Sequence, residues 1–305
     1  MTAVDAHRRW VPAPSWRDVV LTLAPLRRGG GDPAHRLVSG TLWRASRTPA
    51  GVVSVALRPV SGGVEATAYG PGAAWLVERV PTMLGMDQDW SELDVSAVPR
   101  LYETHRRHLG LRLPNTGLVL ESLVPAILEQ KVTGMEARAA WRMLLYRYGE
   151  PAPSPAPPSM RVPPAAADLL AIPTWGWHRL GVDGKRQRAI RAAASVAERL
   201  EAFTGYPAAV ARDLLTRVPG VGVWTAAETT ARAFGDPDAV SVGDHHLPHL
   251  VVHTLTGRPR GSDAEMLELL APWAGQRARV MRLIELGGVM PPRFGPRLPP
   301  GRMPV

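Results

Sequence analysis

The residues best suited to chemistry are two closely spaced glycines and an aspartate that follows them. The chain reads PGVG from Pro219 to Gly222, between two helical patterns, and Asp244 stands 19 positions after Thr225. Glycines at such a turn let the backbone approach a ligand closely, and the helix that begins at Gly222 presents unpaired N–H groups at its positive end. This pattern is typical of a phosphate site, although a helix that ends at a glycine before an ordinary turn has the same sequence.

The net charge of the chain agrees with a polyanionic partner. Its 305 residues include 36 Lys and Arg against 27 Asp and Glu, which gives a formal charge of +9. Such a balance suits nucleic acid or another anionic surface. Lys131 and Lys185 are the only lysines, so any chemistry that needs a side-chain amine has two candidates. The predicted phosphate-binding hairpin consists of Pro219, Gly220, Val221, Gly222 and Thr225.

The absence of cysteine and of long apolar runs narrows the class of protein. Without cysteine there are no disulfides, cysteine–zinc sites or cysteine-held iron–sulfur clusters. The apolar run at residues 117–128 is interrupted by Glu121 and is too short to span a bilayer, and the first ten residues have no apolar core of signal-peptide length. We therefore expect a cytoplasmic protein with no membrane association.

The elements that position the hairpin are expected to be mostly helical, after a small α+β unit with an antiparallel sheet. Alternating β-branched and aromatic residues predict strands at 19–26, 38–46, 51–60 and 64–70. Helical patterns then occupy residues 72–85, 97–110, 165–171, 185–203, 207–218, 222–234, 246–255 and 276–286.

Two capping boxes and a proline-rich segment divide the helical part. Thr133 with Glu136 begins a helix that runs to Tyr148, and Ser262 with Glu265 begins another. The segment 150–164 contains too many prolines for a helix and is expected to be an extended surface connection. The expected domains are an α+β domain at 1–112, a helical domain of two subdomains at 113–290 with the linker 150–164, and a basic, disordered tail at 291–305.

The motifs around the hairpin resemble a known family. VPGVGVWTA at 218–226, followed by VSVGDHHL at 240–247, is similar to the helix-hairpin-helix DNA glycosylases, specifically their alkylpurine (3-methyladenine) DNA glycosylase II branch. ILEQKVT at 127–133 resembles an earlier helix element of that family, and residues 180–194 resemble the helix before the hairpin. The resemblance spans residues 116–286. For residues 1–112 it rests on a β-rich domain of the right size.

The resemblance implies a monofunctional DNA glycosylase of base excision repair. Such an enzyme hydrolyses the N-glycosidic bond of alkylated purines, of the 3-methyladenine and 7-methylguanine type, in duplex DNA and leaves an abasic site. Asp244 matches the catalytic aspartate, whose carboxylate can stabilise oxocarbenium character or orient water. An aspartate at this place can also act simply as the N-cap of the helix that begins at His246, and the two roles are compatible.

The predicted base pocket consists of Trp224, Glu228 and His245. Some relatives in the superfamily carry a Schiff-base lysine at the position of Trp224, so its replacement implies a monofunctional enzyme. The indole would line the pocket of a cationic base, or else pack in the core. Glu228 lies one helical turn later and would face the pocket or the solvent. His245 and His246 would approach DNA phosphate or orient Asp244.

Two departures from the family pattern concern the contacts to the DNA and to the base. After Gln130, where the alkylpurine branch has an apolar residue that fills the gap left by the extruded base, this chain has Lys131. A lysine stem can still occupy that gap while its amine reaches a phosphate. In the last helix, where relatives carry a stacking aromatic residue, this chain offers Arg277, Arg279 and Arg282.

The remaining expectations concern ligands and partners. The partner is double-stranded DNA with alkylated bases, the chain is expected to be a monomer, and no organic cofactor is implied. The family implies a monovalent cation at the carbonyls of Val218 and Val221, and a metal at His245, His246, His249 and His253 is the less favoured reading of that cluster. The alternatives from other classes are a non-catalytic helix-hairpin-helix DNA-binding protein and a glycosylase for bulkier alkyl adducts.

Overall fold

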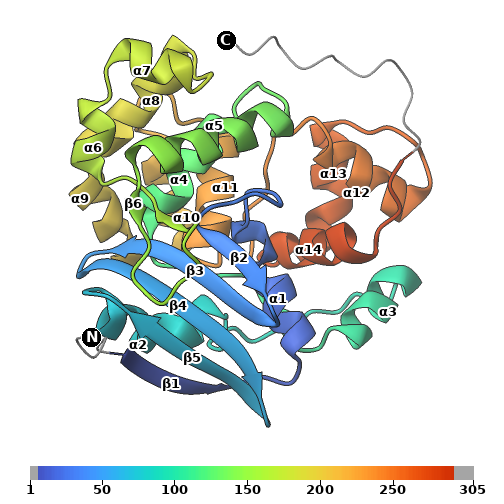
Figure 1. Ribbon diagram of the computed structural model, residues 1–305. Helices are drawn as coiled ribbons and strands as arrows, with labels where there is room; N and C mark the ends of the chain where they lie inside the picture. The colour runs from blue at the N-terminus through green and yellow to red at the C-terminus, as the bar shows by residue number, and fades with distance from the viewer. Residues whose placement is uncertain (1–5, 292–305) are drawn as a thin grey trace.

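The computed structural model describes residues 6–291 and combines a five-stranded antiparallel sheet with a larger set of helices (Figure 1). The predicted tail lies outside the described residues, apart from Pro291. The spatial order of the strands is β1-β5-β4-β3-β2. The strands are β1 (Ala6–Pro12), β2 (His35–Val38), β3 (Thr41–Thr48), β4 (Gly51–Val60) and β5 (Gly63–Tyr69).

The antiparallel sheet is confirmed, but two of its predicted segments were wrong in detail. Residues 19–26 form helix α1 (Trp16–Leu23) and a 3-10 turn rather than a strand. The Ser15 side chain caps this helix, and Val19 and Leu23 bury one face four residues apart, so tertiary packing overrides their β propensity. Residues 38–46 contain a hairpin turn, because Ser39 and Gly40 both have positive φ, as a two-residue hairpin loop requires.

The helices form two groups that share no single core. The first group centres on α4 and α11, which pack against each other, and the second joins α12, α13 and α14 with α3. The helices are α2 (Ala73–Met83), α3 (Pro99–Arg107), α4 (Val119–Leu128), α5 (Gly134–Tyr148), α6 (Ala166–Ala171), α7 (Thr174–Arg179), α8 (Gly184–Ser195), α9 (Ala197–Glu201), α10 (Ala208–Leu215), α11 (Val223–Ala233), α12 (Leu247–Thr256), α13 (Asp263–Leu270) and α14 (Arg277–Gly287).

The predicted helices agree with these bounds except around α7 to α9. Both capping boxes form, at Thr133 with Glu136 and at Ser262 with Glu265. The predicted helix 185–203 is divided at Val196 into α8 and α9, and α7 was not predicted. No helix among residues 6–291 is long and apolar enough to cross a membrane.

The cores do not divide the chain at residue 112. Helix α2 packs on strands β1, β4 and β5, within the core of the sheet. Helix α3 instead packs against α14, and Leu101 and Leu111 belong to the core of the C-terminal helices (Figure 1). The last helix, α14, therefore packs against a helix from the N-terminal third of the chain. The second helical group contains residues from both predicted domains.

The proline-rich segment is more than a surface connection. It contributes the short strand pair β6 (Glu150–Pro151) and β7 (Arg161–Val162), and Met160 and Val162 pack against Trp43 and Ala56 of the sheet. Neighbouring residues on a strand point to opposite faces, and Leu57 next to Ala56 lies in the core beneath α2. The segment thus covers the sheet face that α2 leaves open.

Candidate active site

The glycine hairpin forms between α10 and α11. Helix α10 ends at Leu215 with Thr216 as its C-cap, so Gly220 is not a C-cap glycine but the turn of the hairpin itself. Gly220 has a φ of +86°, and an added Cβ would lie 2.6 Å from the Ala189 Cβ of α8. Only glycine meets both conditions without strain. Gly222 is the extended N-cap of α11, and no side chain caps this helix start, which leaves its N–H groups for a ligand.

Gln130 ties the hairpin to the end of α4. Its amide nitrogen Nε2 donates to the Gly220 carbonyl over 2.9 Å and to the Thr225 hydroxyl over 2.8 Å. Thr225 is buried, so its side chain supports the hairpin from within. Lys131 is exposed and has a φ of +53°, a conformation that a side chain with a Cβ rarely adopts. Gln130 thus fixes the hairpin and also the position of the neighbouring Lys131 on the surface.

Asp244 caps α12 with one carboxylate oxygen and meets the hairpin helix with the other. Oδ1 accepts from the N–H groups of His246, at 2.7 Å, and Leu247, at 2.9 Å. Oδ2 accepts from the indole Nε1 of Trp224 at 3.1 Å. The capping interpretation from the sequence therefore accounts for one oxygen of this half-buried residue, and the other oxygen contacts α11 through Trp224.

The turn that carries Asp244 is held by three further contacts. The Asp244 N–H donates to the Ser241 carbonyl over 3.2 Å, and the Gly243 N–H lies 3.1 Å from both carboxylate oxygens of Asp263. Gly243 has a φ of +90°, which glycine adopts without strain. Asp263 was not among the predicted site residues, because its 20-residue separation from Gly243 leaves no sequence pattern.

Trp224 and Glu228 lie one turn apart on α11, in different surroundings. Trp224 is half-buried and belongs to none of the hydrophobic cores of residues 6–291, so the core-packing alternative does not describe it. Glu228 is not solvated. Its Oε2 pairs with Arg232 at 2.7 Å, its Oε1 accepts from the Ser241 hydroxyl at 2.5 Å, and its side chain is 18% exposed. Both oxygens of Glu228 thus already have partners within the protein.

The histidines after Asp244 are divided between the surface and a neighbouring loop. His245 and His246 are exposed, with ring centroids 4.8 Å apart. His249 contacts the Gly261 carbonyl and His253 the Gly257 carbonyl through Nδ1, at 2.9 Å and 3.1 Å. Among the residues that the structure describes, no three His, Cys, Asp or Glu side chains are grouped closely enough to hold a metal ion. The metal interpretation of this cluster therefore has no geometric support.

Two carbonyls of the hairpin already accept hydrogen bonds within the protein. The Val218 carbonyl accepts from the Val221 N–H at 3.0 Å, and the Gly220 carbonyl accepts from Gln130. Each carbonyl oxygen has two lone pairs, so one remains for a further ligand. The monovalent cation implied at Val218 and Val221 remains a prediction.

The three arginines of α14 have structural partners. Arg277 pairs with Asp238, and Arg282 donates to the Leu21 carbonyl over 2.7 Å. Arg279 stacks over the buried ring of Trp90 with its guanidinium 5.4 Å from the centroid. Burial alone would raise the pKa of the Asp238 carboxyl, but hydrogen bonds from Arg277 lower it below its usual value. None of these guanidinium groups replaces the stacking aromatic of the family.

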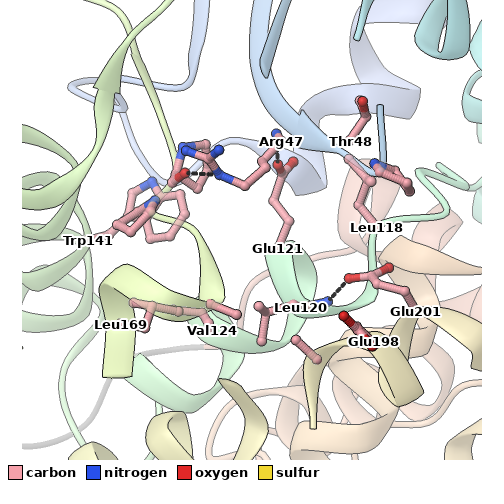
Figure 2. Close-up of a pocket in the computed structure, with 15 residues that line it drawn as sticks. Arg47, Thr48, Leu118, Leu120, Glu121, Val124, Trp141, Leu169, Glu198 and Glu201 are labelled. Atoms are coloured by element: carbon pink, nitrogen blue, oxygen red, sulfur yellow. Dashed lines mark hydrogen bonds between the residues drawn. The ribbon is translucent and has the colours of Figure 1, made fainter. Parts of the chain in front are cut away.

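A cavity of about 500 Å³ lies elsewhere in the molecule, between the end of β3 and helices α4, α5, α6 and α9. Figure 2 shows its apolar floor and the Glu201 side chain, which accepts from the Leu120 N–H. The cavity shares no residue with the hairpin or with the Asp244 turn. Two of its three carboxylates stabilise the fold, since Glu121 pairs with Arg44 and Glu201 caps α4, and the third, Glu198, is exposed. We therefore place the candidate active site at the hairpin and not in this cavity.

The chain is similar to known proteins in sequence and in structure. No family model matches the chain. The chain is 32% identical over 170 residues to the probable bifunctional transcriptional activator/DNA repair enzyme AlkA of two Mycobacterium tuberculosis strains, a match that covers 54% of the chain and 34% of those proteins. The matched region thus spans about a third of the length of these curated relatives.

Solved structures extend the similarity to almost the whole chain. The 3-methyladenine DNA-glycosylase of Archaeoglobus fulgidus has a TM-score of 0.74 at 20% identity, over 92% of this chain and 98% of that one. The 8-oxoguanine glycosylase/lyase of Clostridium acetobutylicum has a TM-score of 0.70 at 12% identity, over 93% and 96%.

The chain has the helix-hairpin-helix DNA glycosylase fold, in the form with a sheet-containing N-terminal domain. Within this class, the resemblance to the alkylpurine branch that the sequence motifs indicated is confirmed, since a 3-methyladenine glycosylase and AlkA are both among the similar proteins.

Proposed function

We propose that this chain is a monofunctional DNA glycosylase of base excision repair that acts on alkylated purines in duplex DNA. One observation carries the proposal: the Asp244 carboxylate is fixed on one side by the N-terminus of α12 and on the other by the Trp224 indole, directly beside the hairpin helix. A carboxylate fixed in this way is ready to face positive charge without reorganising. The similarity in sequence to AlkA and in fold to a 3-methyladenine DNA-glycosylase supports the same substrate class.

The reaction needs only one carboxylate if the leaving base is already cationic. In an N3- or N7-alkylated purine, the bond between C1′ and the ring nitrogen breaks with its electron pair, and the base leaves neutral. The sugar then carries oxocarbenium character, which Asp244 stabilises while it orients water for attack on C1′ and accepts the proton. Trp224 presents an indole where a cationic base would be held, and a π-face attracts such a base.

The DNA backbone is bound by the hairpin, and the base is rotated out of the duplex. Phosphate contacts from the N–H groups after Gly220 and Gly222 fix the register and read no sequence. Extrusion of the base costs roughly a few kcal/mol. Lys131 projects from the surface beside the hairpin, next to Gln130, which binds the hairpin. Its stem occupies the gap and its amine pairs with phosphate. With tryptophan in place of an amine at position 224, no Schiff base forms and the strand remains uncut.

A second candidate function is the release of bulkier alkyl adducts. It is favoured because α14 has no aromatic residue to stack on the base. Arg277, Arg279 and Arg282 of this helix are engaged within the protein. The non-catalytic alternative is less well supported, because phosphate binding alone does not require the bond between Asp244 and Trp224.

The test is chromatography of bases released from methylated duplex DNA. We expect 3-methyladenine and 7-methylguanine in the supernatant, with a strand that breaks only after alkali treatment. Borohydride should trap no covalent complex with abasic DNA, because no Schiff base forms. A duplex with bulkier alkyl adducts, assayed in parallel, separates the two substrate classes. Tight DNA binding with no release from either duplex would contradict the enzyme and support the binding protein.

A further inference from the structure

Two partly buried ion pairs lie close together, since Arg28 and Arg232 line one small cavity, and we call them the four-charge cluster: Arg28, Glu129, Glu228 and Arg232. Arg28 pairs with Glu129 at 2.9 Å, and Arg232 pairs with Glu228 at 2.7 Å. Burial lowers the pKa of Arg28 against the attraction of Glu129, and the charge of Arg232 lowers it further. For Arg232, the attraction of both glutamates outweighs burial and raises its pKa. Each pair therefore acts on the other.

One end of the four-charge cluster reaches the Asp244 turn through Ser241. The Ser241 hydroxyl donates to Glu228 over 2.5 Å, and its carbonyl accepts the N–H of Asp244 over 3.2 Å. Ser241 is 6% exposed, so water does not substitute freely for either contact. A single residue thus joins Glu228 to the backbone of the proposed catalytic aspartate.

The other end of the four-charge cluster contacts the N-terminal domain and includes the first residue of the segment 129–133 between α4 and α5, which we call the Lys131 loop. Glu129 directly precedes Gln130, whose amide holds the hairpin. The Arg232 Nε donates to the Pro25 carbonyl over 3.0 Å, and the Arg28 N–H donates to Asp32 over 2.7 Å. The segment between α1 and β2 is thereby fixed against α4 and α11, although it lies far from them in the sequence.

We propose that Glu228 and Ser241 are positioning residues for Asp244, and that through the four-charge cluster the N-terminal domain fixes the Asp244 turn and the Lys131 loop relative to the hairpin. The proposal rests on the proposed function. In this account Glu228 acts through Ser241 and does not contact the base. Buried ion pairs often add little net stability, so a positional role explains the cluster better than a stabilising one. Misplacement of a reacting group by about 1 Å can cost a large factor in rate.

The chain supplies a matched control for this contact. At the junction of β3 and α4, the hydroxyl of Ser46 donates to Glu121 over 2.9 Å, and Glu121 pairs with Arg44. This is the same arrangement of serine, glutamate and arginine, with Ser46 also buried. Arg44 and Glu121 line one small cavity with Arg28 and Arg232, but the Ser46 hydroxyl contacts Glu121 and not the Asp244 turn. Ser46→Ala therefore removes a comparable hydrogen bond that is not made to residues of that turn.

The experiment measures single-turnover base release at saturating enzyme, together with abasic-DNA affinity, at a temperature where every variant is folded. Ser241→Ala should lower the release rate about tenfold with unchanged affinity, Ser241→Thr should restore most of the rate, and Ser46→Ala should release at the native rate. Glu228→Gln should follow Ser241→Ala.

Each opposing result is distinct. Native rates in both Ser241→Ala and Glu228→Gln would overturn the positioning role while leaving the proposed function intact. Equal losses in Ser241→Ala and Ser46→Ala would indicate a general stability effect and would also overturn it. No release by the native protein would overturn the proposed function and, with it, this inference.

Discussion

Asp244 and Glu201 both accept hydrogen bonds from backbone N–H groups at the start of a helix, yet their surroundings differ. Glu201 uses both oxygens for the first turn of α4, at 2.9 Å from the N–H groups of Val119 and Leu120. Asp244 uses one oxygen for α12 and directs the other to the Trp224 indole. Glu201 thus commits both oxygens to backbone N–H groups, whereas Asp244 directs one oxygen to a side chain of the hairpin helix.

Both residues are half-buried, and at Glu201 this burial affects the pKa. Desolvation raises the pKa of the Glu201 carboxyl against the hydrogen bonds from Leu120 and Val119, which lower it. Asp244 remains half-exposed beside exposed histidines. The cavity in Figure 2 therefore contains two carboxylates with structural partners, Glu121 and Glu201, whereas Asp244 at the hairpin is the carboxylate that fits the proposed reaction.

The largest effect on stability is expected from Glu201→Ala. The substitution leaves the buried N–H groups at the start of α4 without acceptors, and the free energy of unfolding should fall by about 2 kcal/mol. Chemical denaturation checks this value. Base release by the folded protein should be unchanged. A large loss of release at full stability would mean that the cavity, and not the hairpin, is the active site.

A smaller effect, on activity, is expected from Trp224→Phe. The ring remains, but the hydrogen bond from the indole to Asp244 is lost, so single-turnover base release should slow about tenfold at unchanged stability. Trp177, which is fully buried, serves as a control: Trp177→Phe should lower the melting temperature and leave the release rate of the folded protein intact. A native release rate in Trp224→Phe would contradict the view that its contact with Trp224 makes Asp244, unlike Glu201, active in base release.

The two lysines offer a paired test of the strained loop. Lys131 has a φ of +53°, whereas Lys185 lies in the first turn of α8. Lys131→Gly should raise the free energy of unfolding by about 0.5 kcal/mol, because glycine accepts this conformation, and Lys185→Gly should lower it by a similar amount. Abasic-DNA affinity should fall in Lys131→Gly. If both variants lose stability equally, the loop is not strained.

The smallest effect concerns pH. Because the pKa of Glu201 is higher in the folded than in the unfolded protein, the folded state holds the proton more tightly. Its contribution to stability is therefore present below the unfolded pKa and is lost as pH rises through the folded pKa. The difference in unfolding free energy between the native protein and Glu201→Gln should shift in that direction over this range. A constant difference would contradict the raised pKa.

Local signals could be read from the sequence, and long-range contacts could not. The hairpin was predictable because closely spaced glycines allow the positive φ that Gly220 adopts, and both capping boxes act within three residues. Helix α1 was missed because burial of Val19 and Leu23 decides the structure of a β-branched run. The contact of Ser241 with Glu228 spans 13 residues with no periodicity, and that of Arg28 with Glu129 spans 101. Only the folded chain brings these groups together.

The central claim is that Asp244 drives base release, and the direct measurement compares the native protein with Asp244→Asn on methylated duplex DNA. Asparagine retains the cap of α12, so stability and abasic-DNA affinity should remain close to native. Release should fall by about 100-fold or more, because the negative charge opposite the oxocarbenium sugar is lost. Release at the native rate by Asp244→Asn, with the protein folded and bound to DNA, would contradict the account.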